Sequence, residues 1–127
     1  MRQPFENARE AHHFGADAER AVAAFLIAGE YDVLGQRLRI ARDEVDVVAC
    51  KDDTVAFVEV KARRRGWSGA TAVDRKKRAR MVRAALAWLA ENERYQHCGI
   101  RFDVALVWPG ARLEYLENAF EAEPGFF

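Results

Sequence analysis

The chain has 127 residues, of which 50% are hydrophobic and 31% are charged, a composition that excludes disordered and fibrous proteins. The length suits one domain, and we predict a single domain over residues 1–127 with its core at about 14–116. Twenty Lys and Arg balance twenty Asp and Glu, so the whole chain lacks the basic excess of a non-specific nucleic-acid binder.

The first half of the chain predicts a helix followed by three strands. Apolar residues recur at helical spacing over 14–28, and Gly29 is a suitable C-terminal stop. The segment 31–40 is rich in apolar residues but contains a central glycine, which indicates a strand with a bulge. Two valine-rich runs, 45–50 and 55–61, are separated by a polar tetrad with two central aspartates and therefore predict a β-hairpin.

The second half predicts a loop, a long helix and two strands. A glycine-containing loop at 64–70 surrounds Trp67, and a helical pattern follows over about 73–92. The inward stripe of this helix consists of Ala79, Val82, Leu86 and Leu89. Alternation over 100–108 and a short run at 113–116 predict the last two strands. This order of elements predicts an α/β fold with helices packed on a sheet.

The hairpin turn sets the register of the charged residues on its two strands. With residues 52–53 at the centre of the turn, antiparallel pairing places Asp46 opposite Glu59 and Glu44 opposite Lys61. These four side chains would leave one face of the sheet, and a slip of one residue would drive them into the valine layer on the other face. The valines of that layer are Val45, Val47, Val58 and Val60.

Two carboxylates held side by side repel each other, so Asp46 and Glu59 indicate a bound cation or a shared proton. Oxygen ligands without imidazole or thiolate favour a hard ion, and Mg²⁺ suits best because it keeps waters and substrate phosphates. Lys61 adds a positive charge for an anionic substrate, which together with a metal and activated water is what phosphodiester hydrolysis needs. The structural alternative is an ion pair between Glu44 and Lys61, with both other carboxylates solvated.

Glu19 adds a further acid to this set. It lies three residues before Val22 and seven before Leu26, on the inward stripe of the first helix, and should point toward the sheet. A carboxylate at the border of the core is either neutralised by a nearby Arg or serves as a further metal or water ligand.

Half of the Lys and Arg residues lie between residues 61 and 83. The candidates for contacts with nucleic-acid phosphates are Arg63, Arg64, Arg65, Arg75, Lys76, Lys77 and Arg80. Such cations contribute salt-dependent affinity without base sequence preference, which fits recognition of DNA shape or branches. The structural alternative is a solvated helix face, and Trp67 either stacks on a base or packs on its own domain.

Cys50 and Cys98 form no Cys-x-x-Cys pair, and the histidines show no ligand spacing, so we predict neither a disulfide framework nor a thiolate zinc site. No apolar run approaches the ~20 residues that a membrane-spanning helix needs, and residues 1–10 are polar. We therefore expect a cytoplasmic protein with no membrane partner.

The acidic residues resemble the signature of a nuclease superfamily. Asp46, followed on the next strand by Glu59-Val60-Lys61, resembles the Asp and Glu-x-Lys signature of the restriction-endonuclease-like (PD-(D/E)XK) nucleases. Over roughly 14–107 the chain is similar to the bacterial YraN family, and this small form is most similar to the archaeal Holliday-junction resolvases. The further matching positions are Glu19, 43–46, 57–63, Lys76 or Lys77, and 101–104.

The resemblance implies a restriction-endonuclease-like fold, with a central mixed β-sheet flanked by helices. It implies a Mg²⁺-dependent endonuclease, with Mn²⁺ as a substitute, that hydrolyses DNA and acts on branched or junction DNA. Asp46, Glu59 and the Val60 carbonyl are the implied metal ligands, with Lys61 orienting water or stabilising charge and Glu19 as an accessory acid. The implied partners are DNA and a second copy of the chain, because cutting two strands needs two active sites.

Glu44 is a candidate accessory residue beside this site. The chain departs from the family at Asp43, where Gly is usual, and from the superfamily at Val45, where proline is frequent. Asp43 adds negative charge close to the site, and this charge affects how many metal ions we expect the site to bind. Two other classes stay open: a catalytically silent nucleic-acid-binding module of the same fold, and a protein-interaction domain whose charges only keep it solvated.

Overall fold

The computed structural model describes residues 8–40, 42–62, 73–110 and 112–122. Its helices and strands, in chain order, are α1 (Ala8–Ala28), β1 (Asp32–Ile40), β2 (Asp43–Lys51), β3 (Thr54–Ala62), α2 (Arg75–Glu91), the short 3-10 helix η2 (Glu93–Tyr95), β4 (Gly99–Trp108) and β5 (Arg112–Phe120). The predicted order of one helix, three strands, one helix and two strands is confirmed. Trp67 and the predicted loop 64–70, together with the cations at 63–65, lie outside the described residues.

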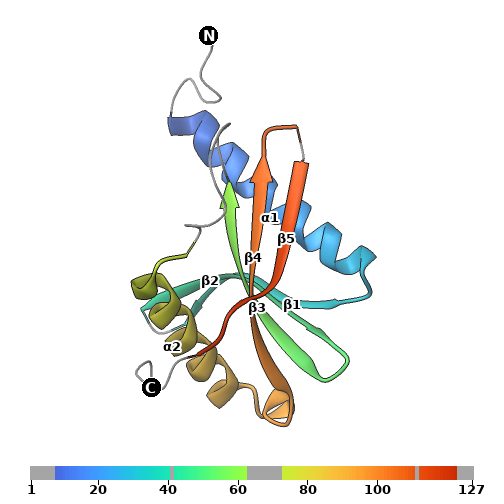
Figure 1. Cartoon of the computed structure of the whole chain (residues 1–127), viewed down its shortest axis with the longest axis vertical. Helices are drawn as coiled ribbons and strands as arrows, with labels where there is room; N and C mark the ends of the chain where they lie inside the picture. Colours follow the sequence, from blue (N-terminus) through green and yellow to red (C-terminus); the bar gives the residue numbers. More distant parts are fainter. Residues whose placement is uncertain (1–7, 41, 63–72, 111, 123–127) are drawn as a thin grey trace.

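The five strands form one sheet in the order β1-β2-β3-β4-β5 (Figure 1). β3 and β4 are parallel, while the other neighbouring pairs are antiparallel, so the sheet is mixed. Parallel neighbours need a crossover connection, which α2 provides between β3 and β4. The α/β class with a central mixed sheet flanked by helices is confirmed and is consistent with a restriction-endonuclease-like domain.

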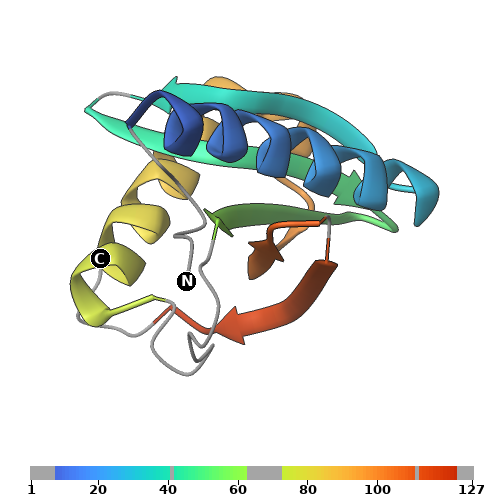
Figure 2. The same cartoon turned by 90° about the horizontal axis from the view of Figure 1, so that it is seen from above.

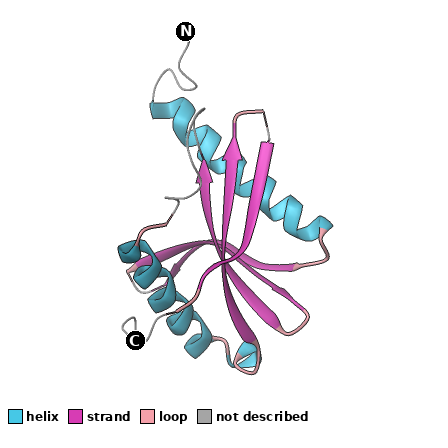
Figure 3. Ribbon diagram, viewed as in Figure 1, coloured by secondary structure: helices cyan, strands magenta, loops and turns pink. Residues whose placement is uncertain are grey.

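The two long helices lie on opposite faces of the sheet (Figures 2 and 3). On the α1 face, Val22 and Leu26 pack against small and valine side chains of the central strands, among them Val47 and Val58. On the α2 face, Phe57 lies at the centre of a larger cluster that includes Trp88. Among the helices of the described residues, none combines the length and the apolar character needed to cross a membrane.

The connection after α1 explains where this helix ends. The N–H of Glu30 donates to Ile27 O at 3.0 Å and that of Tyr31 to Leu26 O at 2.9 Å, the pair of bonds of a Schellman motif. Glu30 takes the left-handed conformation, with φ +70°, at the position after Gly29 where glycine is usual. The predicted helix end at residue 28 is confirmed, although the left-handed residue is Glu30.

The β2–β3 hairpin follows the predicted register from its turn to Val47, but its ladder does not include the predicted pairs Asp46–Glu59 and Glu44–Lys61. Asp52 and Asp53 both have positive φ, +49° and +59°, as a two-residue type I′ turn requires. The ladder runs from Lys51↔Thr54 to Val47↔Val58. In β1 the register shifts between Val33 and Gly35, which confirms the predicted bulge.

Three details of the packing differ from the sequence analysis. Val45 packs in the α2-side cluster with Val48, and not with Val47 on the other face, so the strict alternation of β2 is broken around Asp46. Leu86 is exposed because Ala85 and Trp88 take the inward positions of α2. β5 continues to Phe120, whose ring stacks on Phe102 of β4 at 4.9 Å, beyond the predicted end at residue 116.

Candidate functional site

The candidate site lies where β2 and β3 separate. One residue beyond the last ladder pair, Oδ2 of Asp46 accepts a hydrogen bond from the N–H of Val60 at 2.8 Å. The side chain of Asp46 thus occupies the place where a backbone partner would continue the ladder. Because the N–H and C=O of a strand residue point to the same side, the Val60 carbonyl is directed toward β2 as well.

Asp46 stands in an unfavourable electrostatic environment. Burial, reinforced by the neighbouring Glu59 carboxylate, raises the pKa of Asp46 to about 7. Glu19 adds a smaller effect in the same direction, and the N–H of Val60 opposes it. The structure therefore brings Asp46 close enough to interact with both of the other predicted acids, Glu59 and Glu19.

Glu59 is buried, with 6% of its surface exposed, and its charge is matched by two ammonium groups. Nζ of Lys61 lies 3.2 Å and Nζ of Lys77 3.4 Å from Oε1 of Glu59. Lys77 reaches this position because Asp74 caps α2 by accepting the N–H of Lys77 at 2.8 Å, which fixes the first turn of the helix. We predicted Lys77 as a contact to nucleic acid, and the structure places it inside the acidic site.

Glu19 points from α1 toward β1, where it forms an ion pair with Arg37. Arg37 has φ +50°, a left-handed conformation that is uncommon for a residue with a long side chain. The hydrogen bond from Arg37 to Glu19 raises the pKa of the guanidinium. Of the two alternatives that the sequence left open for Glu19, the structure contains the neutralising arginine.

Glu44 lies at the edge of the site and does not pair with Lys61 as expected. It is exposed and lies opposite Arg39 of β1, whereas Lys61 pairs along β3 with Leu106 of β4. The expected pairing is wrong because the β2–β3 ladder ends at Val47↔Val58.

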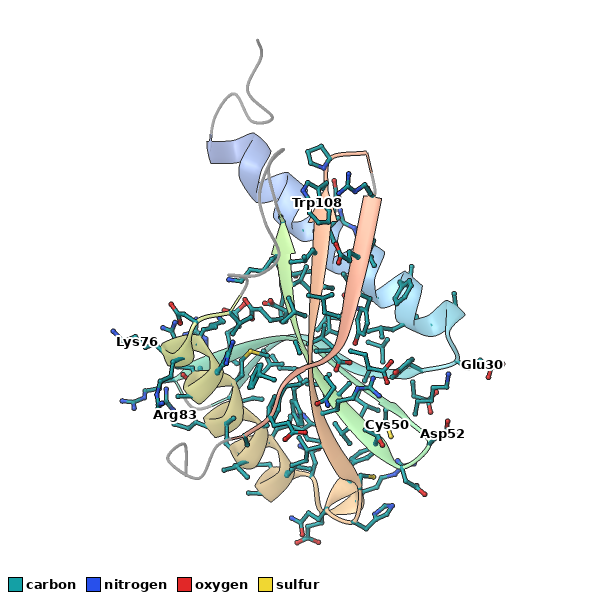
Figure 4. The ribbon with its side chains drawn as sticks, in the orientation of Figure 1. Glu30, Cys50, Asp52, Lys76, Arg83 and Trp108 are labelled. Carbon is teal, nitrogen blue, oxygen red and sulfur yellow. The ribbon has the colours of Figure 1, made fainter. Side chains whose placement is uncertain are left out.

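The exposed cations of α2 continue from the acidic site. Arg75, Lys76 and Arg80 are exposed in the first turns of the helix, and Lys76 projects outward on the side of Arg83 (Figure 4). A small cavity of about 140 Å³ joins this helix to the start of β2. It is lined by Arg42, Asp43, Glu44, Lys77, Arg80 and Met81.

Comparison with known proteins places the chain in a family. The model of the family described as "Uncharacterised protein family UPF0102" matches residues 18–107. A UPF0102 protein of Nitrobacter winogradskyi is 43% identical over 112 residues, which cover 88% of this chain and 95% of that protein. The chain belongs to the UPF0102 family.

Two further relatives carry the same name. A UPF0102 protein of Rhodopseudomonas palustris (strain HaA2) is 40% identical over 110 residues, covering 87% of this chain and 86% of the relative. A UPF0102 protein of Methylorubrum extorquens is 39% identical over 120 residues, covering 94% of each chain. The resemblance to the YraN family is confirmed, since UPF0102 and YraN denote one family.

Asp43 departs from the residue that the resemblance leads us to expect in a UPF0102 protein, and the structure shows how its charge is compensated. Arg83 donates from Nε and Nη2 to the two carboxylate oxygens of Asp43, each at 2.8 Å. This bidentate hydrogen bonding lowers the pKa of Asp43. Asp43 is therefore paired with Arg83 and does not face the Asp46–Glu59 pair as an uncompensated charge.

The donor set of this UPF0102 chain fits a hard divalent ion. Asp46, Glu59 and the Val60 carbonyl offer only oxygen atoms, the ligands that Mg²⁺ prefers. A divalent ion would also stabilise the charged form of Asp46, which burial and then the Glu59 carboxylate disfavour. Glu19 does not join these two acids in a compact three-carboxylate cluster, because its carboxylate is held by Arg37.

Proposed function

We propose that this UPF0102 protein is a Mg²⁺-dependent endonuclease that hydrolyses phosphodiester bonds in branched or junction DNA, with Mn²⁺ as a substitute ion. The observation that carries this proposal is the half-buried Asp46 beside the buried Glu59, where burial and then repulsion by Glu59 raise the pKa of Asp46 to about 7. Burying like charges side by side costs stability, so their juxtaposition favours a functional cation site over a structural role.

The protein's own residues have distinct roles in this proposal. Asp46, Glu59 and the Val60 carbonyl would hold the ion, which supplies Lewis acidity and lowers the pKa of water. Lys61, which lies 3.2 Å from Glu59, would stabilise the negative charge that develops on the phosphate oxygens. Lys77 offers a second ammonium group at the same carboxylate, and Glu19 is the accessory acid on the α1 side.

The exposed cations of α2 would bind the DNA backbone. Arg75 and Lys76 precede Lys77 and Arg80 follows it in the first turns of the helix, so phosphates bound there would lie close to the acidic pair. Phosphate contacts position a duplex without reading its sequence, which fits recognition of DNA shape. Cutting both strands of a junction needs two active sites, so the proposal includes a homodimer.

Incubation of junction and duplex DNA with Mg²⁺ or Mn²⁺ tests the enzymatic role, with wild type compared with Glu59→Ala. Loss of a metal ligand removes several kcal/mol of charge stabilisation, so cleavage should fall by about 10²-fold or more. Glu114→Ala, an exposed carboxylate on β5, is the matched control and should cleave as wild type does. Equal cleavage by wild type and Glu59→Ala would contradict the proposal.

A catalytically silent nucleic-acid-binding module is the second candidate. It is favoured by the pairing of Glu59 with Lys61 and Lys77, which leaves that carboxylate compensated without a metal ion. The hypothesis of a silent binding module predicts that wild type binds DNA in a salt-dependent manner and does not cleave it with either Mg²⁺ or Mn²⁺. Binding that is lost in Arg80→Gln and Lys76→Gln while no cleavage is seen would favour it.

A further inference from the structure

A second cluster of potential ligands lies at the turn end of the β2–β3 hairpin. His97 precedes β4, and its Nε2 lies 3.6 Å from Sγ of Cys98 and 3.7 Å from Oδ1 of Asp53. Within the described residues, Asp53, His97 and Cys98 are the group of three whose ligand atoms all lie within 4.8 Å of one another. Asp53 is more than forty residues away from the adjacent His97 and Cys98, which is why no ligand spacing revealed the group.

The distances match those between ligands of one metal ion. With Zn–S near 2.3 Å and Zn–N near 2.0–2.1 Å, nitrogen and sulfur atoms of a tetrahedral site lie about 3.5 Å apart, and nitrogen and oxygen about 3.4 Å apart. The imidazole nitrogen of His97 faces both partners at once, whereas a neutral ring nitrogen carries at most one N–H to donate. The separation from Asp53, 3.7 Å, is also longer than a hydrogen bond. One cation between the three atoms would satisfy all of them.

Cys50 of β2 adjoins the cluster. Its pKa is raised mainly by burial and then by the neighbouring thiol of Cys98, so the two sulfur atoms interact. Figure 4 shows Cys50 beside Asp52 at the hairpin end, well away from Lys76. Cys50 and Cys98 also pack against the same α2-side cluster, so Cys50 is the thiol from which a fourth ligand could come.

The backbone around these residues is held by hydrogen bonds. The N–H of Gly99 donates to Asp53 O at 2.9 Å, which joins the hairpin turn to the start of β4. The N–H of Cys98 donates to Tyr95 O at 3.0 Å, which fixes the turn after η2. Three of the four candidate ligands therefore belong to segments that are already fastened together, which lowers the entropy cost of binding an ion.

We propose that Asp53, His97 and Cys98, with Cys50 as the fourth ligand, form a binding site for a borderline divalent cation such as Zn²⁺. Thiolate and imidazole select Zn²⁺ or Co²⁺ over Mg²⁺, so this site and the Asp46–Glu59 pair differ in the ion they take. Each thiol that binds the ion releases its proton to solvent. The ion would tie the hairpin turn to the start of β4.

The site is independent of the proposed catalytic centre. Thr54, next to the turn, and Glu59 are five residues apart along β3, which is about 17 Å in an extended strand. The ion at the hairpin is therefore too remote to touch a substrate held by Asp46 and Glu59, and its role is to stabilise the fold. Failure of the nuclease proposal would leave this one intact.

Titration of the reduced full-length protein with Co²⁺ in excess Mg²⁺ tests the proposal. We expect one Co²⁺ per chain, with a thiolate-to-cobalt charge-transfer band and the visible bands of tetrahedral Co²⁺. Zn²⁺ should displace the cobalt and raise the melting temperature. In His97→Gln and Cys98→Ser the affinity should fall by at least about 10-fold, the loss that removal of even an outer-shell partner can cause.

Four variants keep the test decisive. The side chains of His97 and Asp53 are 67% and 87% exposed, so His97→Gln and Asp53→Asn will fold even if the cysteine variants do not. Cys50→Ser should weaken the charge-transfer band if this thiol is the fourth ligand. Asp46→Asn should bind Co²⁺ as wild type does. Absence of the charge-transfer band in wild type, or unchanged binding in both His97→Gln and Asp53→Asn, would overturn the proposal.

Discussion

Asp46 and Asp103 lie on adjoining parts of one sheet, yet their surroundings are opposite. Asp103 is fully buried and accepts hydrogen bonds from Arg101, from the hydroxyl of Tyr115 and from the N–H of Asn118. The register of β4 and β5 shifts beside Asp103, and Asn118 takes a positive φ of +53° there. The backbone of β5 is thus adapted to satisfy this carboxylate.

Asp46 accepts a hydrogen bond from the N–H of Val60, and the carboxylates of Glu59 and Glu19 both raise its pKa. Asp103 illustrates how the fold stabilises a buried negative charge when that charge is structural: it supplies a cation and several donors. Within the described part of the chain, no guanidinium donates to Asp46 as Arg101 donates to Asp103. The contrast indicates that Asp103 serves stability, whereas the environment of Asp46 is costly without an added cation.

The largest effect on stability is expected from Asp103→Asn. This change leaves the half-buried guanidinium of Arg101 with the hydroxyl of Tyr31 and the exposed carboxylate of Glu117, and breaking one side of a buried ion pair costs about 3–5 kcal/mol. Urea denaturation at neutral pH measures the free energy of unfolding. Glu117→Gln removes the exposed carboxylate that pairs with the same guanidinium, and it should change the free energy of unfolding by less than about 0.5 kcal/mol. A loss below about 1 kcal/mol for Asp103→Asn would remove the distinction between the two aspartates.

Asp46→Asn should increase the free energy of unfolding in the absence of divalent ions, whereas Asp103→Asn decreases it. The pKa of Asp46 is about 7 in the folded protein and close to 3.9 in an unfolded chain, so between these pH values the folded state binds the extra proton. The stability of wild type should therefore fall as pH rises from about 4 to about 7 and stay lower above that range. The asparagine variant has no carboxylate to ionise, so it should be more stable at pH 8 by at most about 4 kcal/mol, the equivalent of about three pKa units.

Unfolding curves in EDTA at pH 4 and at pH 8 provide the measurement. Asparagine keeps an oxygen that can accept the N–H of Val60, so the variant removes the charge and retains the hydrogen bond. If the two proteins differ equally at both pH values, repulsion between the carboxylates is not the cause.

Divalent ions should stabilise wild type and leave Asp46→Asn unchanged. A ligand that binds only the folded state at ten times its Kd adds about 1.4 kcal/mol. Thermal denaturation with Mg²⁺ or Mn²⁺ at pH 8 measures the shift, with Asp53→Asn present as a control for the cluster at the hairpin turn. An equal rise in melting temperature for wild type and Asp46→Asn would place the ion elsewhere.

The smallest effect is expected from Asp43→Asn. Arg83 is partly exposed, so the loss of its bidentate pair with Asp43 should cost about 1 kcal/mol. Because Arg83 already neutralises Asp43, the number of Mg²⁺ ions bound per chain, measured by calorimetric titration, should not change. A change in that number would show that Asp43 contributes to the metal site.

The sequence predicted the elements and the hairpin register because these depend on local chemistry. The paired aspartates at 52–53 adopt the positive φ that a type I′ turn needs, and this turn fixes the partners of every residue up to Val47. The prediction failed where the strands separate, because alternation along β2 breaks at Asp46 and moves Val45 to the other face. The residues proposed as catalytic lie at this irregularity.

The partners of the acidic residues could not be predicted in the same way. Arg37, which pairs with Glu19, has a left-handed backbone conformation that the sequence did not indicate. Lys77, which pairs with Glu59, belongs to a helix that follows residues 63–72. The cluster of Asp53, His97 and Cys98 likewise depends on the parallel pairing of β3 with β4. Contacts between elements that are distant in sequence can be predicted only when the topology of the sheet is known, and the spacing of residue types does not reveal that topology.

The strand order leaves β1 and β5 at the two edges of the sheet, and both edges carry charges. Arg37 and Arg39 are exposed on β1, while Glu114 and Glu117 are exposed on β5. A row of unpaired backbone groups invites another strand to add, and charged side chains oppose this by requiring desolvation. Strand addition at either edge would therefore be costly, which protects the protein against edge-to-edge aggregation at high concentration.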